Sequence, residues 1–335
     1  GQGDERGLAL IGVAGVQSDL GDVEGALAGY RAAAAFPRLE ANALTGVGLV
    51  LHKAGDLEGA LAHYALAEGP AEREDDLLEL CRSVGGQAEL MVQLGRAEDA
   101  EAKLRVTLAL GPGLPQQGRY WLNAALGEVL RQRDRPLEAR EAYLRAASLA
   151  DQDAIFQLVN RANLGLTELL LGDGDAARAY LEPVRQGMSG GGTLFEATIE
   201  AIWLAALAQT GCFEELAEVL DGTLAMVEQR GVTERDVGWA LQHAGALAAR
   251  AGQLGSAVRC VAAALRVWIL LGMADEVRAC ELALVELRGQ GAPVPVGPWL
   301  LERLLGEGGM GQVWLAQDRS GPLAVKVLHR AVSRE

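Results

Sequence analysis

The sequence predicts an all-α solenoid built from helical hairpins and followed by a short C-terminal β segment. Three observations lead to this prediction. A helix-turn-helix pattern recurs over the first 289 residues, half of all residues are hydrophobic while only 4% are aromatic, and the composition changes after Gly289. Repeating units that cannot bury an apolar face alone are stabilised by stacking on their neighbours, which is the principle of a solenoid.

The turn of each hairpin is marked by a glycine or an aspartate. In the stretch 48–67, Gly55 is expected to end the first helix in the left-handed conformation, and Asp56 to cap the second. Small residues at Gly48 and Ala60 let the helices approach, and larger side chains fill the seam, namely Leu51, Leu57, Leu61 and Tyr64. From Gly21 the turns recur at spacings of 34, 40, 39, 38, 39 and 41 residues, at Gly55, Gly95, Asp134, Gly172, Gly211 and Gly252.

This pattern resembles the tetratricopeptide repeat (TPR). The best matches are Gly48/Gly55/Ala60/Tyr64/Ala67, Ala14/Gly21/Ala26/Tyr30/Ala33 and Gly127/Asp134/Ala139/Tyr143/Ala146. The unit around Gly252 has Val261 in place of the aromatic residue, and the unit around Gly211 has Leu216 in place of alanine. The resemblance implies a right-handed α-solenoid of TPR-like hairpins whose first helices line a concave face. It specifies a fold and leaves the partner open.

Seven helix pairs and a closing helix are expected in the repeat domain, residues 1–289. The pairs are placed at about 7–36, 39–69, 73–110, 116–150, 154–187, 194–230 and 234–272, and the closing helix at about 274–288. The segment 111–115 breaks the array because proline cannot continue a helix. Residues 290–298, rich in proline and glycine, are expected to be a linker, with a separate C-terminal segment at 299–335.

A second break is expected at 187–192, where the letters G-x-S-x-G occur. A nucleophile elbow requires a preceding strand together with an acid and a histidine. Helical patterns flank the segment, so a flexible loop is favoured over a hydrolase site.

Charge and composition exclude several classes of function. The net charge is -15, of which residues 1–298 carry about -16 by difference, so the acidic surface belongs to the repeats and should repel nucleic acid and anionic membranes. No leader or membrane-spanning run is evident, which favours a cytoplasmic protein, and the start at Gly1 without Met suggests a piece of a larger one. No metal site is expected: Cys81, Cys212, Cys260 and Cys280 lack C-x-x-C spacing and are expected to be buried apolar side chains, and His52 and His63 lack further ligands.

Candidate partner-binding residues lie on the first helices of the pairs. Polar and aromatic side chains there are expected to contact a protein or peptide on the concave face, namely Arg82, Glu89, Trp121, Glu128, Arg131, Trp239 and Gln242, with Gln93 and Arg250 as further members. The alternative for Trp121 and Trp239 is packing between neighbouring repeats. Asn123, Asn160 and Asn163 are interpreted either as clamps for a peptide backbone or as helix-surface residues.

The segment after Trp299 has a different pattern, which indicates a strand, a glycine loop, a strand, a turn and a strand. Gly306-x-Gly308-x-x-Gly311-x-Val313 is followed by Ala324-Val325-Lys326. Glycines let backbone N–H groups approach phosphates closely, and a lysine on the third strand adds positive charge. The two motifs agree in order, spacing and strand context, so a chance glycine-rich hairpin is disfavoured.

This segment resembles the start of a bacterial-type serine/threonine protein kinase domain. The resemblance implies that Gly306, Gly308 and Gly311 cover the phosphates of ATP, that Val313 and Ala324 contact the adenine, and that Lys326 holds the α- and β-phosphates. The catalytic loop and the magnesium site of that family are missing from this sequence, so it contains no catalytic residues and is not expected to be an enzyme by itself. ATP and Mg²⁺ belong to a complete kinase, and neither is expected to bind this chain. An isolated three-stranded meander is marginal, so residues 290–335 are expected to be poorly anchored, or to pair with another chain or with the end of the array.

Two functions remain open. In the first, the repeats are the regulatory, protein-binding arm of a larger serine/threonine protein kinase, a signalling transferase. In the second, the chain is a non-catalytic TPR scaffold that binds a protein or peptide and has a vestigial kinase tail. Intact glycines together with Lys326 favour the first.

Overall fold

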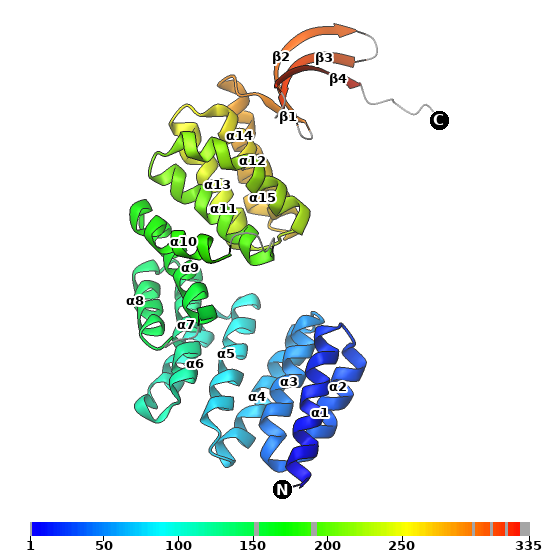
Figure 1. Ribbon diagram of the computed structural model, residues 1–335, viewed down its shortest axis with the longest axis vertical. Helices are drawn as coiled ribbons and strands as arrows, with labels where there is room; N and C mark the ends of the chain where they lie inside the picture. Colours follow the sequence, from blue (N-terminus) through cyan, green and yellow to red (C-terminus); the bar gives the residue numbers. More distant parts are fainter. Residues whose placement is uncertain are drawn as a thin grey trace, which may run out of the picture. The chain divides into compact units, whose positions relative to one another are not determined.

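The computed structural model describes residues 2–150, 154–188, 193–296, 299–308, 311–318 and 321–328. These residues form fifteen α-helices and four strands (Figure 1). Seven helical hairpins comprise α1 Gln2–Asp19 and α2 Val23–Ala33, α3 Glu40–Lys53 and α4 Leu57–Arg73, α5 Leu77–Gln93 and α6 Ala97–Leu108, α7 Gln116–Gln132 and α8 Pro136–Ala147, α9 Ala154–Leu171 and α10 Gly174–Met188, α11 Leu194–Gln209 and α12 Phe213–Arg230, and α13 Arg235–Arg250 and α14 Leu254–Leu270. The closing helix is α15 Ala274–Gly289, and short 3₁₀ turns occur at Pro37–Leu39 and Gly111–Gly113. The predicted all-α solenoid class is confirmed.

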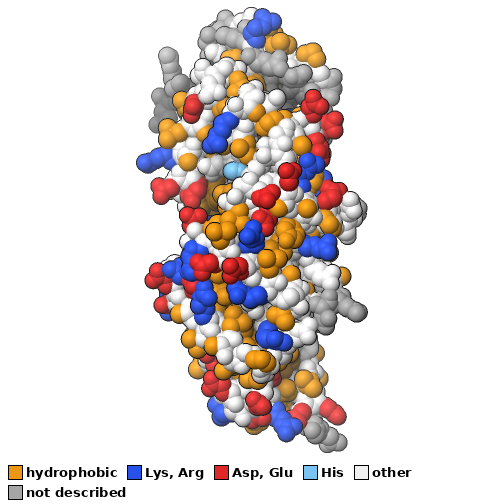
Figure 2. Space-filling view, turned by 90° about the vertical axis from the view of Figure 1, so that its left-hand side faces the viewer, with side chains coloured by type: hydrophobic (Ala, Val, Ile, Leu, Met, Phe, Trp, Pro, Cys, Tyr) orange, Lys and Arg blue, Asp and Glu red, His pale blue; other side chains and the backbone are white. Residues whose placement is uncertain are grey.

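The chain forms two compact units, Gly1–Thr167 and Glu168–Glu335. The boundary between the two units falls inside α9. In the first unit, the first helices of successive hairpins pack on one another, α3 against α5 and α5 against α7. In the second unit, α11 packs against α13 and α15 packs against α14. On the face shown in Figure 2, acidic and basic side chains are interleaved, with hydrophobic side chains exposed between them.

The hairpin turns adopt the predicted left-handed conformation. Gly55 has a φ of 85°, and the other turn residues also have positive φ, including Asp134 at 56°. In the second hairpin, Asp56 follows the turn and its side chain accepts a hydrogen bond of 2.9 Å from the backbone N–H of Gly59, which caps α4. Asp22 caps α2 in the same way. Local turn chemistry therefore ends and restarts the helices at regular intervals.

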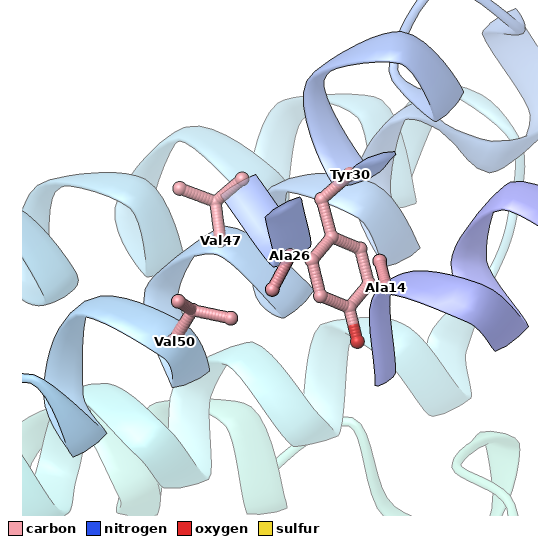
Figure 3. Close-up of a cluster of buried hydrophobic side chains, with 5 residues drawn as sticks. All are labelled: Ala14, Ala26, Tyr30, Val47 and Val50. Atoms are coloured by element: carbon pink, nitrogen blue, oxygen red, sulfur yellow. The ribbon is translucent and has the colours of Figure 1, made fainter. Parts of the chain in front are cut away.

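Tyr64, in the second helix of its hairpin, packs between small residues of two successive hairpins. A Cβ added at Gly48 of the same hairpin would lie 2.8 Å from Tyr64 Cδ1, and one added at Gly86 of the next would lie 2.7 Å from Tyr64 Cζ. Tyr30 is placed similarly: its ring is directed toward Ala14 of α1, with Val47 and Val50 of α3 close by (Figure 3). The aromatic position and the small positions of the repeat are thus two halves of one contact.

The four strands form one antiparallel sheet in the order β1-β2-β3-β4. They are β1 Val294–Val296, β2 Trp299–Gly308, β3 Gly311–Asp318 and β4 Gly321–Leu328. One face of the sheet carries a small apolar cluster of Leu301, Ala316 and Val325, with Trp314 and Leu323 packed against it. The predicted succession of three strands, β2 to β4, is confirmed.

Two expectations about the irregular segments need correction. Part of the segment 290–298, expected to be a linker, forms the edge strand β1, which lies against α14. A proline is tolerated there because an edge strand has one side without ladder hydrogen bonds, and the flanking valines favour extended backbone. The break expected at 187–192 begins later, since Gly187 and Met188 belong to α10; Ser189 to Gly192 lie outside the described residues.

Candidate functional site

A groove of about 710 Å³ lies in the first unit. Its lining comes mainly from the first helices of four successive hairpins, α3, α5, α7 and α9, and includes Tyr64 of α4. Helices α5 and α7 contribute small residues, at Gly85, Gly86, Ala124 and Ala125. Short side chains at the centre of two adjacent helices leave the space that larger neighbours enclose.

The groove has an aromatic wall where α7 meets the start of α9. The rings of Tyr120 and Phe156 stack with centroids 4.5 Å apart, and the Tyr120 hydroxyl donates a 3.0 Å hydrogen bond to the carbonyl oxygen of Phe156. Trp121 meets Phe156 edge to face, with centroids 6.5 Å apart. Such offset and T-shaped pairs hold the rings in a defined orientation.

Apolar side chains are exposed along the same groove. Ile155 is 70% exposed, and Leu49 and Val159 are each 37% exposed. Leu49 belongs to α3, and Ile155 and Val159 belong to α9. Exposed aliphatic and aromatic side chains in a groove mark a surface that is stabilised when an apolar group covers it.

Charged groups stand at defined places on the groove walls. Arg82 Nη1 lies 3.2 Å from Oε2 of Glu79, whose side chain is only 4% exposed and also accepts a hydrogen bond from Asn42. The other carboxylate oxygen of Glu79 is buried without a hydrogen-bond partner among the described residues. Glu89 is exposed and forms no ion pair within the described part of the chain. Arg82 is therefore held by one carboxylate, while Glu89 remains available to a partner.

Glu128 accepts more hydrogen bonds than Glu89, the other carboxylate that lines the groove. Arg131 Nη2 lies 2.7 Å from each of its carboxylate oxygens, Gln132 donates at 2.6 Å, and the buried Tyr143 hydroxyl donates at 3.1 Å. Burial by itself would raise the pKa of Glu128, but the Arg131 charge and these hydrogen bonds together hold it below its usual value. Burial and the neighbouring Glu128 charge raise the pKa of Tyr143. The groove therefore carries an ionised carboxylate at neutral pH.

The structure brings four of the predicted partner-binding residues together. Arg82, Glu89, Trp121 and Glu128 all line the groove, as does Gln93. Arg131 binds Glu128 without lining the groove itself. Trp121 fits both interpretations made from the sequence, because it packs on the next hairpin and remains half-buried at the groove.

The remaining candidates lie on α13, in the second unit. Trp239 is half-buried and stacks on His243, with ring centroids 4.8 Å apart. Burial, and then the Arg250 charge, lower the pKa of His243. Gln242 accepts a 3.0 Å hydrogen bond from Trp268 Nε1, so its carbonyl oxygen is already engaged.

Two of the three asparagines are buried and hydrogen-bonded within the fold. The amides of Asn123 and Asn160 donate to the backbone carbonyl oxygens of Arg119 and Tyr143, at 2.7 and 3.0 Å. These two are therefore not helix-surface residues, and their amide donors are already engaged. Asn163 is half-buried.

The sequence prediction considered only polar and aromatic side chains of the first helices, so it did not include the groove residues Leu49, Val159 and Phe156. Leu49, Glu89 and Glu128 each lie six residues before their turn residue. Arg82, Trp121 and Val159 each lie thirteen residues before theirs. Positions seven apart share one face of a helix, so a fixed offset from the turn would have identified Leu49 and Val159. Phe156 follows no such offset and was not predictable in this way.

The predicted nucleotide-binding residues lie on the three strands β2, β3 and β4. The register pairs Gly308 with Gly311, Gly306 with Val313, and Val313 with Lys326. Since side chains alternate between faces, Val313, Ala324 and Lys326 lie on the same face, opposite the apolar cluster around Val325. Ala324 and Lys326 are exposed. Gly309 and Met310, at the tip of the glycine loop, lie outside the described residues.

The cysteine prediction holds for three of the four residues. Cys81, Cys260 and Cys280 are buried, and burial raises the pKa of each thiol, to about 11, 12 and 11 respectively. Cys212 differs because it is half-buried at the start of α12, where Arg178 Nη1 donates to its sulfur at 3.1 Å. Its position directly after the Gly211 turn keeps it at the hairpin edge rather than in the core.

The described residues contain neither a candidate metal cluster nor a candidate membrane-spanning helix. Among them, no three or more His, Cys, Asp or Glu side chains gather in a way that would hold a metal ion. No helix within the described ranges has the length and apolar character needed to cross a membrane.

Comparisons with known proteins identify the fold. No family model matches the sequence, and no curated protein matches it at a significant level. Among solved structures, the chain is similar to a tetratricopeptide repeat protein from Parabacteroides merdae, with 16% identity, a TM-score of 0.50, and coverage of 86% of this chain and 100% of the other. It is also similar to a Rap protein complexed with competence and sporulation factor, with 14% identity, a TM-score of 0.51 and coverage of 76% of each chain.

A third similar structure is a signal transduction ATPase with numerous domains from Pyrococcus horikoshii, which has a tetratricopeptide repeat sensor. The identity is 12%, the TM-score is 0.59, and the match covers 82% of this chain and 44% of the other. Identities this low carry information on architecture only. The chain has the fold of tetratricopeptide repeat proteins.

Proposed function

We propose that this chain is a protein-interaction module that binds a peptide segment of a partner in the groove of its first unit. The observation that carries the proposal is the exposure of Leu49 on α3 and of Ile155 and Val159 on α9 in one groove, which Trp121 and Phe156 also line. Among the similar structures, the Rap protein is complexed with a factor, and the signal transduction ATPase has a repeat sensor. These similarities support a binding function without identifying the ligand.

The groove favours a peptide with an apolar or aromatic anchor and a basic side chain nearby. The anchor would cover Ile155, Val159 and Trp121, removing apolar surface from water. The basic side chain would face Glu89, the exposed carboxylate of the groove, while Arg82 is held by Glu79. Charge complementarity of this kind mainly sets specificity and association rate.

A displayed library of random peptides, selected on the full chain, tests this proposal. Ile155→Glu should weaken the selected peptides at least about tenfold, because a charge replaces an exposed apolar contact at the groove. Val106→Glu is the matched control, since Val106 is a β-branched residue that is 73% exposed on α6, away from the groove. Selected peptides that bind both variants as well as the wild type would show that the groove is not the binding site.

A second assay uses the charge. Glu89→Lys should reverse the preference of the selected peptides from basic to acidic residues beside the anchor. If the same basic peptides are selected on this variant, Glu89 takes no part in recognition.

We also propose that residues 299–328 are the opening strands of a serine/threonine protein kinase domain, so that the repeats act as its regulatory arm. The support is the motif spacing together with the strand register, which pairs Val313 with Lys326 and sets glycines at both ends of the β2–β3 turn. The exposed face bearing Lys326 suits a polyphosphate; the glycines would cover it and Lys326 would neutralise part of its charge. ATP would supply the phosphoryl group in the complete kinase. The alternative is a scaffold with a vestigial tail.

An immunoblot of native lysate with an antibody to the repeats separates these two functions. A species longer by the roughly 200 residues that complete a catalytic domain supports the regulatory arm. A species ending near residue 335 supports the scaffold. The 335-residue chain itself is expected to show no measurable Mg-ATP binding, and saturable binding lost in Lys326→Ala would contradict that expectation.

A further inference from the structure

We propose that a second pocket of the first unit, distinct from the groove, binds a phosphate monoester. This pocket, of about 570 Å³, lies between α6, α7, α8 and the Gly111–Gly113 turn. Three arginines line it, Arg105, Arg119 and Arg145, and its lining, which lies wholly within the described residues, includes no aspartate or glutamate. In a chain of net charge -15, a concave site whose charged lining residues are all arginines is a local reversal of the charge pattern.

Arg119 is the central residue of this proposed site. Its side chain is half-buried and forms no ion pair within the described part of the chain, and its Nε is buried without a hydrogen-bond partner. Buried charged donors are normally satisfied, because leaving one without an acceptor costs more free energy than a hydrogen bond returns. A ligand oxygen entering the pocket would satisfy this donor.

The two other arginines contribute unequally. Arg105 donates from Nε to Glu101 at 2.8 Å and lies 3.5 Å from Glu138 through Nη2, so its charge is largely compensated. Arg145 lies 3.7 Å from Glu141, beyond hydrogen-bond distance, and its side chain is 57% exposed. Arg119 therefore leaves at the pocket one positive charge that is unpaired among the described residues, and the weakly paired Arg145 leaves part of a second, which together match a dianion better than a single carboxylate.

The uncharged lining suggests how the rest of the ligand would be held. Leu108, Pro112, Leu126 and Leu149 form an apolar part of the wall, next to the arginines. The amide of Asn123 and the hydroxyl of Ser148 already donate to backbone carbonyl oxygens. Recognition of the anion thus falls to the guanidinium groups, and an organic substituent would lie on the leucines. The pocket also adjoins the C-terminal ends of α6 and α8, whose dipoles oppose an anion and moderate the affinity.

The two sites use different faces of α7. Arg119, Asn123 and Leu126 belong to the pocket, whereas Trp121 and Glu128 belong to the groove. Residues at these spacings point to different sides of one helix. Phosphate binding in the pocket can therefore be tested independently of peptide binding in the groove.

Isothermal titration of the full chain with phenyl phosphate tests the proposal, in a chloride buffer of constant ionic strength. We expect saturable binding that Arg119→Gln weakens at least about tenfold, as befits the loss of a charged hydrogen-bond donor. Arg31→Gln is the matched control: Arg31 is an exposed arginine of the same unit, without an ion pair among the described residues, and its removal changes the net charge equally. That control should bind like the wild type.

Stability supplies a second readout. Arg119→Gln should be at least as stable as the wild type without ligand, because the lost Nε has no partner in the fold. If this variant does not fold, Arg145→Gln, at an exposed position, should still weaken binding several-fold. The proposal is overturned if phenyl phosphate does not bind saturably, if Arg119→Gln binds it as well as the wild type, or if benzoate binds as tightly as phenyl phosphate.

Discussion

At the scale of single residues, the carboxyl group of Glu234 lies in surroundings that disfavour its ionised form. Glu234 precedes α13 and is half-buried; its carboxylate accepts a 2.8 Å hydrogen bond from the Thr198 hydroxyl. Burial raises the pKa of Glu234, the Thr198 hydrogen bond lowers it in part, and the Asp236 charge raises it further. The charged form is therefore held in the fold at a cost.

The first prediction concerns the pH dependence of this cost. A raised folded pKa means that the folded state binds the proton more tightly than the unfolded chain, so stability falls as pH rises from about 4.3, the unfolded value, through the folded value. Glu234→Gln removes this titration and keeps an acceptor for Thr198. We expect the variant to be more stable than the wild type at pH 7, with the difference vanishing near pH 4, as measured by urea denaturation.

Glu218→Gln is the control for net charge, since Glu218 is an exposed residue of α12 in the same unit. It should lack this pH-dependent gain. An equal gain for both variants would assign the effect to overall charge instead of to Glu234.

At the scale of the helical elements, small and aromatic positions form one repeated contact. Tyr64 fills the space left by Gly48 in its own hairpin and by Gly86 in the next. The contact therefore joins successive hairpins as well as the two helices of one hairpin. Close packing of this kind leaves no room for an added methyl group without movement of the ring.

Two neighbouring glycines of α5 test this contact with opposite expected signs. Gly86→Ala would place a Cβ 2.7 Å from Tyr64 Cζ, and it should lower the free energy of unfolding by about 1–3 kcal/mol. Gly85 has no atom within 4 Å of an added Cβ, so Gly85→Ala should raise it by up to about 1 kcal/mol through helix propensity. Urea denaturation compares them, and equal effects would mean that Tyr64 relaxes freely.

The turns provide a third prediction. Asp134 occupies the position that glycine holds in most hairpins, at a φ of 56° that disfavours a side chain. Asp134→Gly should raise the free energy of unfolding by about 0.5–1 kcal/mol, the relief of left-handed strain being reduced by the greater freedom of the unfolded chain. Asp134→Ala is the control, because it also removes the carboxylate but keeps the Cβ. A gain in the alanine variant would assign the effect to charge.

At the scale of the whole molecule, the chain divides into two compact units. Contacts in a repeat array are made with adjacent hairpins, so cooperativity extends over neighbours and weakens over longer distances. Acidic and basic side chains are interleaved on the face in Figure 2, in a chain whose net charge is -15.

The fourth prediction follows from this division. Calorimetric unfolding of the full chain should give a van't Hoff enthalpy below the calorimetric enthalpy, because the units unfold in separate or overlapping steps. Gly86→Ala, in the first unit, should shift only one component of the transition. A single transition with equal enthalpies, shifted as a whole, would show that the two units unfold together.

The sequence by itself determined the hairpins and their turns. Left-handed glycines, aspartate caps and small-aromatic pairs act over a few residues, so their physical chemistry is readable from spacing. The choice of polar and aromatic side chains on the first helices included Arg82, Glu89, Trp121 and Glu128, which line the groove.

Only the tertiary structure decided which of these positions enclose a space. The groove joins residues of four hairpins, and Phe156 enters it through stacking that no local pattern encodes. Arg119 became notable only when packing buried its Nε without a hydrogen-bond partner among the described residues. Burial and the geometry between hairpins depend on how successive repeats stack, which is a property of contacts between residues distant in sequence.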